Sequence, residues 1–258
     1  MTVSKNMPIA VMDSGIGGTT VLKELIKIMP NENFIYFGDS KNAPYGTKTV
    51  DEVRELTTIN AEALIARGIK GLVIACNTAT AAAGQHLRQL HPEIPIIGIE
   101  PAIKPAALAK ENPVVLVMAT PLTLKQEKFM TLLHKYTDVA NIITLPCPGL
   151  AELIEAGDFD SDEINSYLQR IFEPLNREKI DSIVMGCTHY PLIQDAIIKN
   201  FGKDVDIFYG GEGTARQTMR RLTERSTLSD SKEKGSVEII NTLGTQEVID
   251  CINKILDM

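Results

Sequence analysis

The chain has 258 residues, 44% of them hydrophobic, so it can bury a core as one large domain or two small ones. Its formal net charge is −7, tryptophan is absent, and lysine and arginine do not cluster, which argues against nucleic-acid binding. No apolar run reaches the ~18 residues that a membrane span needs, and the N-terminal segment is not expected to be a signal peptide. We therefore expect a globular protein that binds neither nucleic acid nor membranes.

Short apolar runs alternate with amphipathic stretches, a pattern typical of an α/β fold with parallel strands. In chain order, the first part predicts strands at Ile9–Met12, Phe34–Phe37, Leu72–Ala75 and Ile94–Ile97, with helices at Thr19–Met29 and Val50–Arg67. After Pro101 the alternation restarts, with strands at Val114–Met118, Ile142–Leu145, Ile183–Met185 and Ile207–Tyr209 and helices at Leu122–Lys135, Leu150–Ala156, Ser161–Leu175 and Leu192–Phe201. A polar loop at Glu224–Gly235 then precedes a strand at Val237–Asn241 and a helix at Thr245–Leu256. Two α/β units fit this order better than one sheet.

The four cysteines are Cys76, Cys147, Cys187 and Cys251. In a chain of this length without a signal peptide they indicate reduced thiols in a cytoplasm rather than a disulfide scaffold. Their spacing has neither a C-x2-C pair nor a flanking histidine pair, so no metal site is expected. Cys147, between two prolines, and Cys251, on the inner face of the last helix, are predicted to be packing residues.

The other two cysteines lie in matching contexts. Residues 69–78 and 180–189 each run from an apolar strand through a small residue to Cys76 or Cys187, then to a hydroxyl residue and a helix. Ligands of open α/β sheets bind at the carboxyl ends of strands, and a cysteine there can cap the following helix, whose dipole favours a thiolate. A pair of such cysteines, one in each unit, favours a function over simple packing.

Two thiols from opposed units suit a particular chemistry. A thiolate can remove a proton from one face of a carbon while a thiol returns one to the other face, which is what interconverting mirror images requires. The sequence has neither a glycine-rich dinucleotide fingerprint nor a Walker A lysine. Nothing in the sequence singles out a Schiff-base lysine, and proton transfer without a cofactor is one candidate reaction.

Three further motifs accompany the cysteines. Residues 13–18, Asp-Ser-Gly-Ile-Gly-Gly, lie between the first strand and helix, where exposed backbone N–H groups could bind a carboxylate. Pro44-Tyr45-Gly46 indicates a turn. His189, two residues after Cys187, is close enough for its imidazole to support thiolate formation or proton exchange.

Together these motifs, with Ala75-Cys76-Asn77-Thr78-Ala79 and Gly186-Cys187-Thr188-His189-Tyr190-Pro191, resemble the glutamate racemase family of the aspartate/glutamate racemase superfamily along nearly the whole chain. The resemblance implies two pseudosymmetric α/β domains, with the active site in the cleft between them and no cofactor. It also implies that the end of the chain returns to the first domain. The expected domains are residues 1–99 with 211–258, and residues 100–210.

The resemblance also implies roles for individual residues. Cys76 would act on D-glutamate and Cys187 on L-glutamate, assisted by Asp13 and His189 respectively, with Asp39 and Glu155 as secondary acidic candidates. The expected substrate-binding residues are Asp13, Ser14, Pro44, Tyr45, Gly46, Asn77, Thr78, Thr120 and Thr188. Supply of D-glutamate for peptidoglycan, a bacterial cytoplasm and a homodimer are the further implications.

Two segments depart from the family pattern, and three other functions remain open. The departures are Thr120-Pro121-Leu122-Thr123-Leu124-Lys125, near the expected hinge, and Tyr209-Gly210-Gly211-Glu212-Gly213, where the chain is expected to return. The alternatives are a racemase of aspartate or another amino acid, a non-catalytic ligand-binding module, and a hydrolase using Cys187 with His189. The hydrolase leaves Cys76 without a role.

Overall fold

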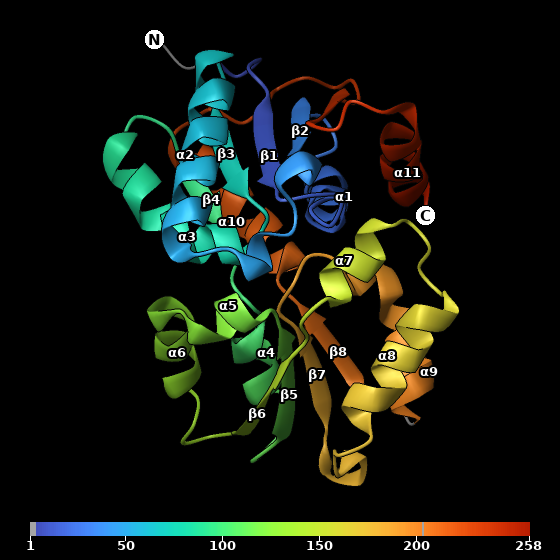
Figure 1. Ribbon diagram of the computed structural model, residues 1–258. Helices are drawn as coiled ribbons and strands as arrows, with labels where there is room; N and C mark the ends of the chain where they lie inside the picture. Colours follow the sequence, from blue (N-terminus) through green and yellow to red (C-terminus); the bar gives the residue numbers. More distant parts are fainter. Residues whose placement is uncertain (1–3, 203) are drawn as a thin grey trace.

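The computed structural model describes residues 4–202 and 204–258, which form two sheets of parallel strands with helices on their faces (Figure 1). In the first sheet the strand order is β4-β3-β1-β2-β9, and in the second it is β6-β5-β7-β8. The strands of the first sheet are β1 (Ile9–Asp13), β2 (Phe34–Gly38), β3 (Gly71–Ile74), β4 (Ile96–Gly98) and β9 (Val237–Asn241). Those of the second are β5 (Val114–Ala119), β6 (Asn141–Pro146), β7 (Ser182–Met185) and β8 (Asp206–Tyr209). The predicted α/β class is confirmed.

Helices cover both faces of each sheet. Around the first sheet are α1 (Thr19–Ile28), α2 (Val50–Ala66), α3 (Asn77–Leu90), α10 (Gly211–Glu224) and α11 (Gln246–Asp257). Around the second are α4 (Ile103–Ala107), α6 (Glu127–His134), α7 (Leu150–Glu155), α8 (Asp162–Phe172) and α9 (Gln194–Phe201). Because helices bury both faces, the central strands are continuous apolar runs: every residue of β1 and β3 is buried.

The two sheets repeat one topology. Counting strands in chain order within each unit, both β4-β3-β1-β2 and β8-β7-β5-β6 read fourth, third, first, second. The third strand of each unit, β3 or β7, leads into Cys76 or Cys187. The internal similarity seen in the sequence therefore corresponds to equivalent positions in two sheets.

The end of the chain packs on the first sheet. β9 pairs with β2 in register from Phe34 opposite Val237 to Gly38 opposite Asn241. α10 packs against α1, and α11 contributes Ile252 to the same core. Figure 1 shows these last elements, coloured orange to red, beside the blue N-terminal strands.

One expectation about helices was wrong, and two helices were not predicted. The helix expected at 122–135 is two helices, α5 (Pro121–Lys125) and α6, because the extended backbone of Gln126 breaks it. The short helix α4 and the polar helix α10 were not predicted, since α10 has few apolar residues and begins in the glycine-rich run after Tyr209. No helix in the described part of the chain is both long and apolar enough to cross a membrane.

Candidate active site

Cys76 lies where β3 ends and α3 begins. It is the N-cap of α3, and its Sγ accepts a hydrogen bond from the backbone N–H of Ala79 at 3.5 Å. The side chain is buried, and burial together with the negative charge of Asp13 raises the pKa of its thiol to about 12. The sequence predicted a thiolate here, favoured by the helix dipole. Burial outweighs the dipole, so Cys76 is a neutral thiol at pH 7.

Cys187 occupies the equivalent place after β7, in different surroundings. It is half-buried, and its Sγ lies 3.7 Å from Nδ1 of His189. The α-helix expected directly after it is delayed, because a 3₁₀ turn at Tyr190–Ile193, containing Pro191, comes before α9. Cys187 therefore has an imidazole partner where Cys76 has a helix N-terminus.

His189 and Glu155 form a buried ion pair beside Cys187. The imidazole Nε2 lies 2.6 Å from Oε2 of Glu155 at the end of α7. Burial lowers the pKa of His189, but its hydrogen bonds to Cys187 and Glu155 outweigh burial and raise it well above the usual value. Burial raises the pKa of Glu155, but the hydrogen bond and the charge of His189 outweigh burial and lower it. We conclude that His189 is an imidazolium held by a carboxylate.

The glycine-rich loop after β1 is shaped around this pair. The backbone N–H of Ile16 donates to both carboxylate oxygens of Glu155, at 3.2 and 3.0 Å. A Cβ added at Gly15 would lie 2.3 Å from Glu155 Oε2, and one at Gly17 would lie 2.4 Å from His189 Nδ1. The sequence predicted that N–H groups of this loop could bind a carboxylate, and the chain's own Glu155 binds the N–H of Ile16.

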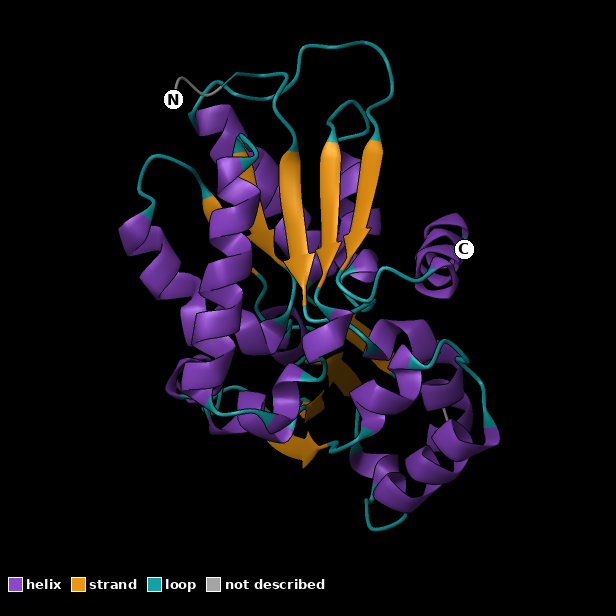
Figure 2. Ribbon diagram, turned by 45° about the horizontal axis from the view of Figure 1, so that its top comes forward, coloured by secondary structure: helices purple, strands orange, loops and turns teal. Residues whose placement is uncertain are grey.

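A cavity of about 210 Å³ lies at the carboxyl ends of both sheets and contains both cysteines. Its size suits a small organic ligand, since a cavity of ~150 Å³ can hold benzene. Of the residues singled out in the sequence, those that line it are Ser14, Pro44, Tyr45, Gly46, Cys76, Thr78, Thr120, Glu155, Cys187 and His189. Figure 2 shows strands of the first sheet pointing toward the other half, where the cavity lies.

Four other residues expected at the site lie outside the lining: Asp13, Asp39, Asn77 and Thr188. Asp13 is buried behind the cavity, where its carboxylate accepts from the Gly15 backbone N–H and the Thr188 hydroxyl, each at 3.1 Å. Burial raises the pKa of Asp13. The Asp39 carboxylate accepts a hydrogen bond from the Tyr45 hydroxyl at 2.7 Å and so helps to hold the Tyr45 ring in place. The buried Asn77 lines a separate small hollow.

Three threonine hydroxyls join the two halves at one end of the cavity. Thr78 lies 3.3 Å from Thr120 and 3.1 Å from Thr123, and Thr123 accepts from Thr120 at 3.0 Å. Thr120 caps α5 and Thr78 lies in the first turn of α3, so this contact joins segments that follow strands of the two sheets. The departure from the family pattern after Thr120 thus leaves its hydroxyl at the cavity.

Sequence reasoning missed two residues at this site. Ser40 lines the cavity and donates its hydroxyl to Glu155 Oε1 at 2.6 Å. Its signal was available, because it lies two residues after the end of β2, at the carboxyl edge of the sheet. Cys147 packs in the core as predicted, but it also lines the cavity. Cys251 is half-buried near Gly157 and packs against the first core.

The cavity is negatively charged apart from one imidazolium. Among the described residues, its lining includes Glu152 and Glu155 but neither lysine nor arginine. An anionic ligand here would be held by hydroxyls, backbone N–H groups and His189. No group of histidine, cysteine or acidic residues within the described ranges is arranged to hold a metal ion. A larger hollow of about 1000 Å³, bordered by Arg88 and Arg221, contains neither cysteine.

Comparisons with known proteins agree with this geometry. Residues 9–217 match the family model described as Asp/Glu/Hydantoin racemase. A glutamate racemase of Clostridium perfringens is 48% identical over 98% of both chains, and one of Clostridium novyi is 49% identical over the same shares.

Two solved structures extend the likeness. The glutamate racemase of Francisella tularensis in complex with D-glutamate has a TM-score of 0.85 at 28% identity, covering 98% of this chain and 95% of that one. That of Escherichia coli, with L-glutamate and the activator UDP-MurNAc-ala, has a TM-score of 0.84 at 29% identity, covering 97% and 94%. From these matches and the paired cysteine sites, the chain belongs to the glutamate racemase family.

Proposed function

We propose that this protein interconverts L- and D-glutamate without a cofactor, using Cys76 and Cys187 as the two acid/base groups. The observation that carries the proposal is that both thiols line one small cavity from equivalent strand ends of two sheets. Opposed groups of this kind can serve the two faces of one α-carbon. The relatives named glutamate racemase, and the complexes with D- and L-glutamate, support the choice of substrate.

The resting states of the two thiols suit one direction of proton transfer. The imidazolium of His189 stabilises a thiolate at Cys187, which removes the α-proton of L-glutamate. The neutral Cys76 thiol then donates its proton to the opposite face, giving D-glutamate and a Cys76 thiolate. In the reverse direction the Cys76 thiolate abstracts the proton from D-glutamate and Cys187 returns one.

The α-proton of an amino acid is a very weak acid, so the negative charge that develops on the substrate carboxylate must be stabilised. The hydroxyls of Ser14 and Thr78 line the cavity and can donate to this carboxylate. Enclosure between the two halves excludes water and strengthens these bonds. Asp13, whose charge acts on Cys76, and His189, which contacts Cys187, assist the respective thiols.

The remaining expectations also stand as part of this proposal. Residues 1–99 with 211–258 form one domain and residues 100–210 the other, supported by the pairing of β9 with β2 and the packing of α10 on α1. The enzyme is a cytoplasmic homodimer that supplies D-glutamate for peptidoglycan. These assignments follow from the family resemblance.

The direct test is racemisation of purified, chelator-treated protein with L-glutamate and no added cofactor, followed by circular dichroism. We expect the optical signal to decay to zero as the racemic mixture forms. Aspartate in a parallel reaction tests specificity, with turnover at least about a hundredfold slower. An unchanged signal with glutamate contradicts the proposal, and faster turnover of aspartate assigns the enzyme to that substrate instead.

A further inference from the structure

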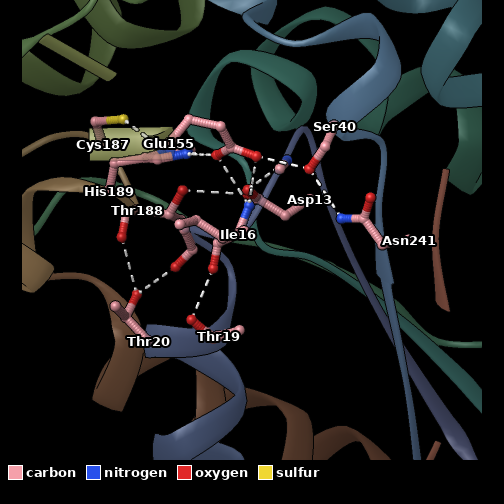
Figure 3. Close-up of polar contacts among 12 residues, drawn as sticks. Asp13, Ile16, Thr19, Thr20, Ser40, Glu155, Cys187, Thr188, His189 and Asn241 are labelled. Atoms are coloured by element: carbon pink, nitrogen blue, oxygen red, sulfur yellow. Dashed lines mark hydrogen bonds and ion pairs between the residues drawn. The ribbon is translucent and has the colours of Figure 1, made fainter. Parts of the chain in front are cut away.

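A row of hydrogen bonds connects the last strand of the first sheet to Cys187 (Figure 3). Asn241, at the end of β9, donates from Nδ2 to the Ser40 hydroxyl at 2.8 Å. Ser40 donates to Glu155 Oε1, and Glu155 Oε2 meets His189 Nε2, both at 2.6 Å. His189 Nδ1 faces the Cys187 sulfur. The row thus joins residues 201 positions apart in sequence at its first step.

Neighbouring groups fix the direction of the first two bonds in this row. The backbone N–H of Leu243 donates to Asn241 Oδ1 at 3.0 Å, so the amide oxygen is occupied and Nδ2 faces Ser40. A serine hydroxyl has one proton to donate. Because Ser40 accepts from Asn241, that proton goes to Glu155.

Every group around the Glu155 carboxylate is therefore a donor. Besides Ser40 and His189, the backbone N–H of Ile16 donates to it. Three donors stabilise the charged carboxylate, and the carboxylate in turn stabilises the imidazolium of His189. The row consequently sets the charge state of the histidine that faces Cys187.

Close packing keeps Asn241 in this place. It is 7% exposed and Ser40 is 8% exposed. A Cβ added at Gly38, its partner on β2, would lie 2.8 Å from Asn241 Nδ2 and 2.7 Å from the Gly15 carbonyl oxygen. Glycine at position 38 is what allows the amide to approach the loop that holds Glu155.

We infer that Asn241 is a positioning residue for proton transfer at Cys187: by orienting the Ser40 hydroxyl, it keeps Glu155 charged and His189 protonated. The inference rests on the proposed racemase function for its kinetic meaning, but the hydrogen-bond row can be tested without substrate. Through this row, the C-terminal strand β9 of the first sheet acts on Cys187, which follows β7 of the second sheet.

Other titratable groups also face this row and stay in place in the variants below. Asp13 at the end of β1 acts electrostatically on both Glu155 and His189. Tyr36 on β2 and Cys251 on α11 each have a pKa raised first by burial and also by the charge of Glu155. Because these groups are the same in every variant, a difference in pH profile between an Asn241 variant and the control variant cannot be assigned to their removal.

The decisive substitution is Asn241→Asp, which keeps Oδ1 for Leu243 but replaces the donor to Ser40 with an acceptor. The Ser40 proton then turns toward the introduced carboxylate and away from Glu155, whose pKa rises. We expect the acidic limb of the kcat/KM profile to move up by about one pH unit, with little change near neutral pH, where Glu155 stays ionised. Asn241→Ala, which only removes the donor, should give a smaller shift in the same direction.

Two further variants separate positioning from general damage. Asn33→Asp makes the same change at the other end of β9, where Asn33 Oδ1 accepts from the backbone N–H and hydroxyl of Ser236. It should leave the pH profile unmoved. Ser40→Ala should reproduce the shift of Asn241→Asp, and the double variant should add nothing to Ser40→Ala alone.

The readout independent of turnover is the ¹⁵N spectrum of labelled histidine, with the His189 signals identified by their loss in His189→Asn. The inflection that Glu155 causes in these signals should move to higher pH in Asn241→Asp and stay in place in Asn33→Asp. An unmoved inflection and limb in folded Asn241→Asp, or in Asn241→Ala where Asn241→Asp does not fold, would overturn the inference. Wild-type protein that leaves glutamate unchanged overturns only the proposed function, because the spectral shift needs no substrate.

Discussion

The two cysteine sites differ although similar strands lead into them. Cys76 caps a 14-residue helix and is buried with a hydroxyl residue, Thr78, two positions later. Cys187 is followed by a turn and is half-buried beside His189, at the same offset. Topology places both thiols at equivalent strand ends, while their surroundings differ: burial and Asp13 act on Cys76, and the imidazole of His189 contacts Cys187.

In the proposed mechanism, this difference makes Cys187 the resting base in one half of the molecule and Cys76 the resting acid in the other. Burial raises the pKa of Cys76, because it disfavours the charged thiolate, and so keeps this thiol neutral. The Cys187 site instead places a buried ion pair, His189 with Glu155, beside the sulfur. Substitutions at the two sites should therefore affect the two directions of proton transfer differently.

The largest effect should come from removing either thiol. We expect Cys76→Ala and Cys187→Ala each to lose about 10³-fold or more in racemisation, since each removes an acid/base group. Residual exchange of the α-hydrogen in deuterated water should be selective, with L-glutamate exchanging in Cys76→Ala and D-glutamate in Cys187→Ala. Mass spectrometry of each enantiomer measures it, and the opposite selectivity would reverse the assignment of faces.

Replacing the imidazole of His189 should impair proton transfer at Cys187 but not at Cys76. We expect His189→Asn to lower kcat/KM about 10²-fold by weakening the Cys187 thiolate. Proton abstraction at Cys187 then limits the rate, so the isotope effect with α-deuterated L-glutamate rises while that with α-deuterated D-glutamate falls. His86→Asn, on the exposed face of α3, is the control. Equal isotope effects for L- and D-glutamate in His189→Asn would show that His189 does not act on Cys187 alone.

Alkylation rates should show the same contrast more weakly. A thiol with a pKa of about 12 is almost wholly protonated at pH 8, so Cys76 should react with iodoacetamide at least about tenfold more slowly than Cys187. Its rate should rise about tenfold per pH unit up to pH 10, because the thiolate fraction does so below the pKa. Peptide mapping by mass spectrometry gives both rates. Faster labelling of Cys76 would contradict the assignment.

Much of the fold could be predicted because buried parallel strands are apolar runs and amphipathic helices follow a period. The strands at the centre of each sheet, such as Ile9–Asp13 and Ser182–Met185, fall where the pattern placed them. The polar helix α10 escaped prediction because its burial depends on α1, which tertiary packing alone brings to it.

The site could be predicted only where a residue lies next to a motif. Cys76, Cys187 and His189 are of this kind. Ser40 and Asn241 could not be paired from the sequence, because their contact depends on β9 returning to lie beside β2. Nor could the state of Cys76 be predicted, since the sequence shows the helix N-terminus but not the burial that outweighs it.

The most direct test of two acid/base groups on opposite faces is where deuterium appears when L-glutamate reacts in deuterated water. In the first few per cent of reaction, the account predicts D-glutamate that carries α-deuterium while the remaining L-glutamate stays protiated. Starting from D-glutamate must give the mirror result. Deuterium entering the remaining substrate as fast as product forms, or product that retains the original proton, would show a single shared base and contradict the account.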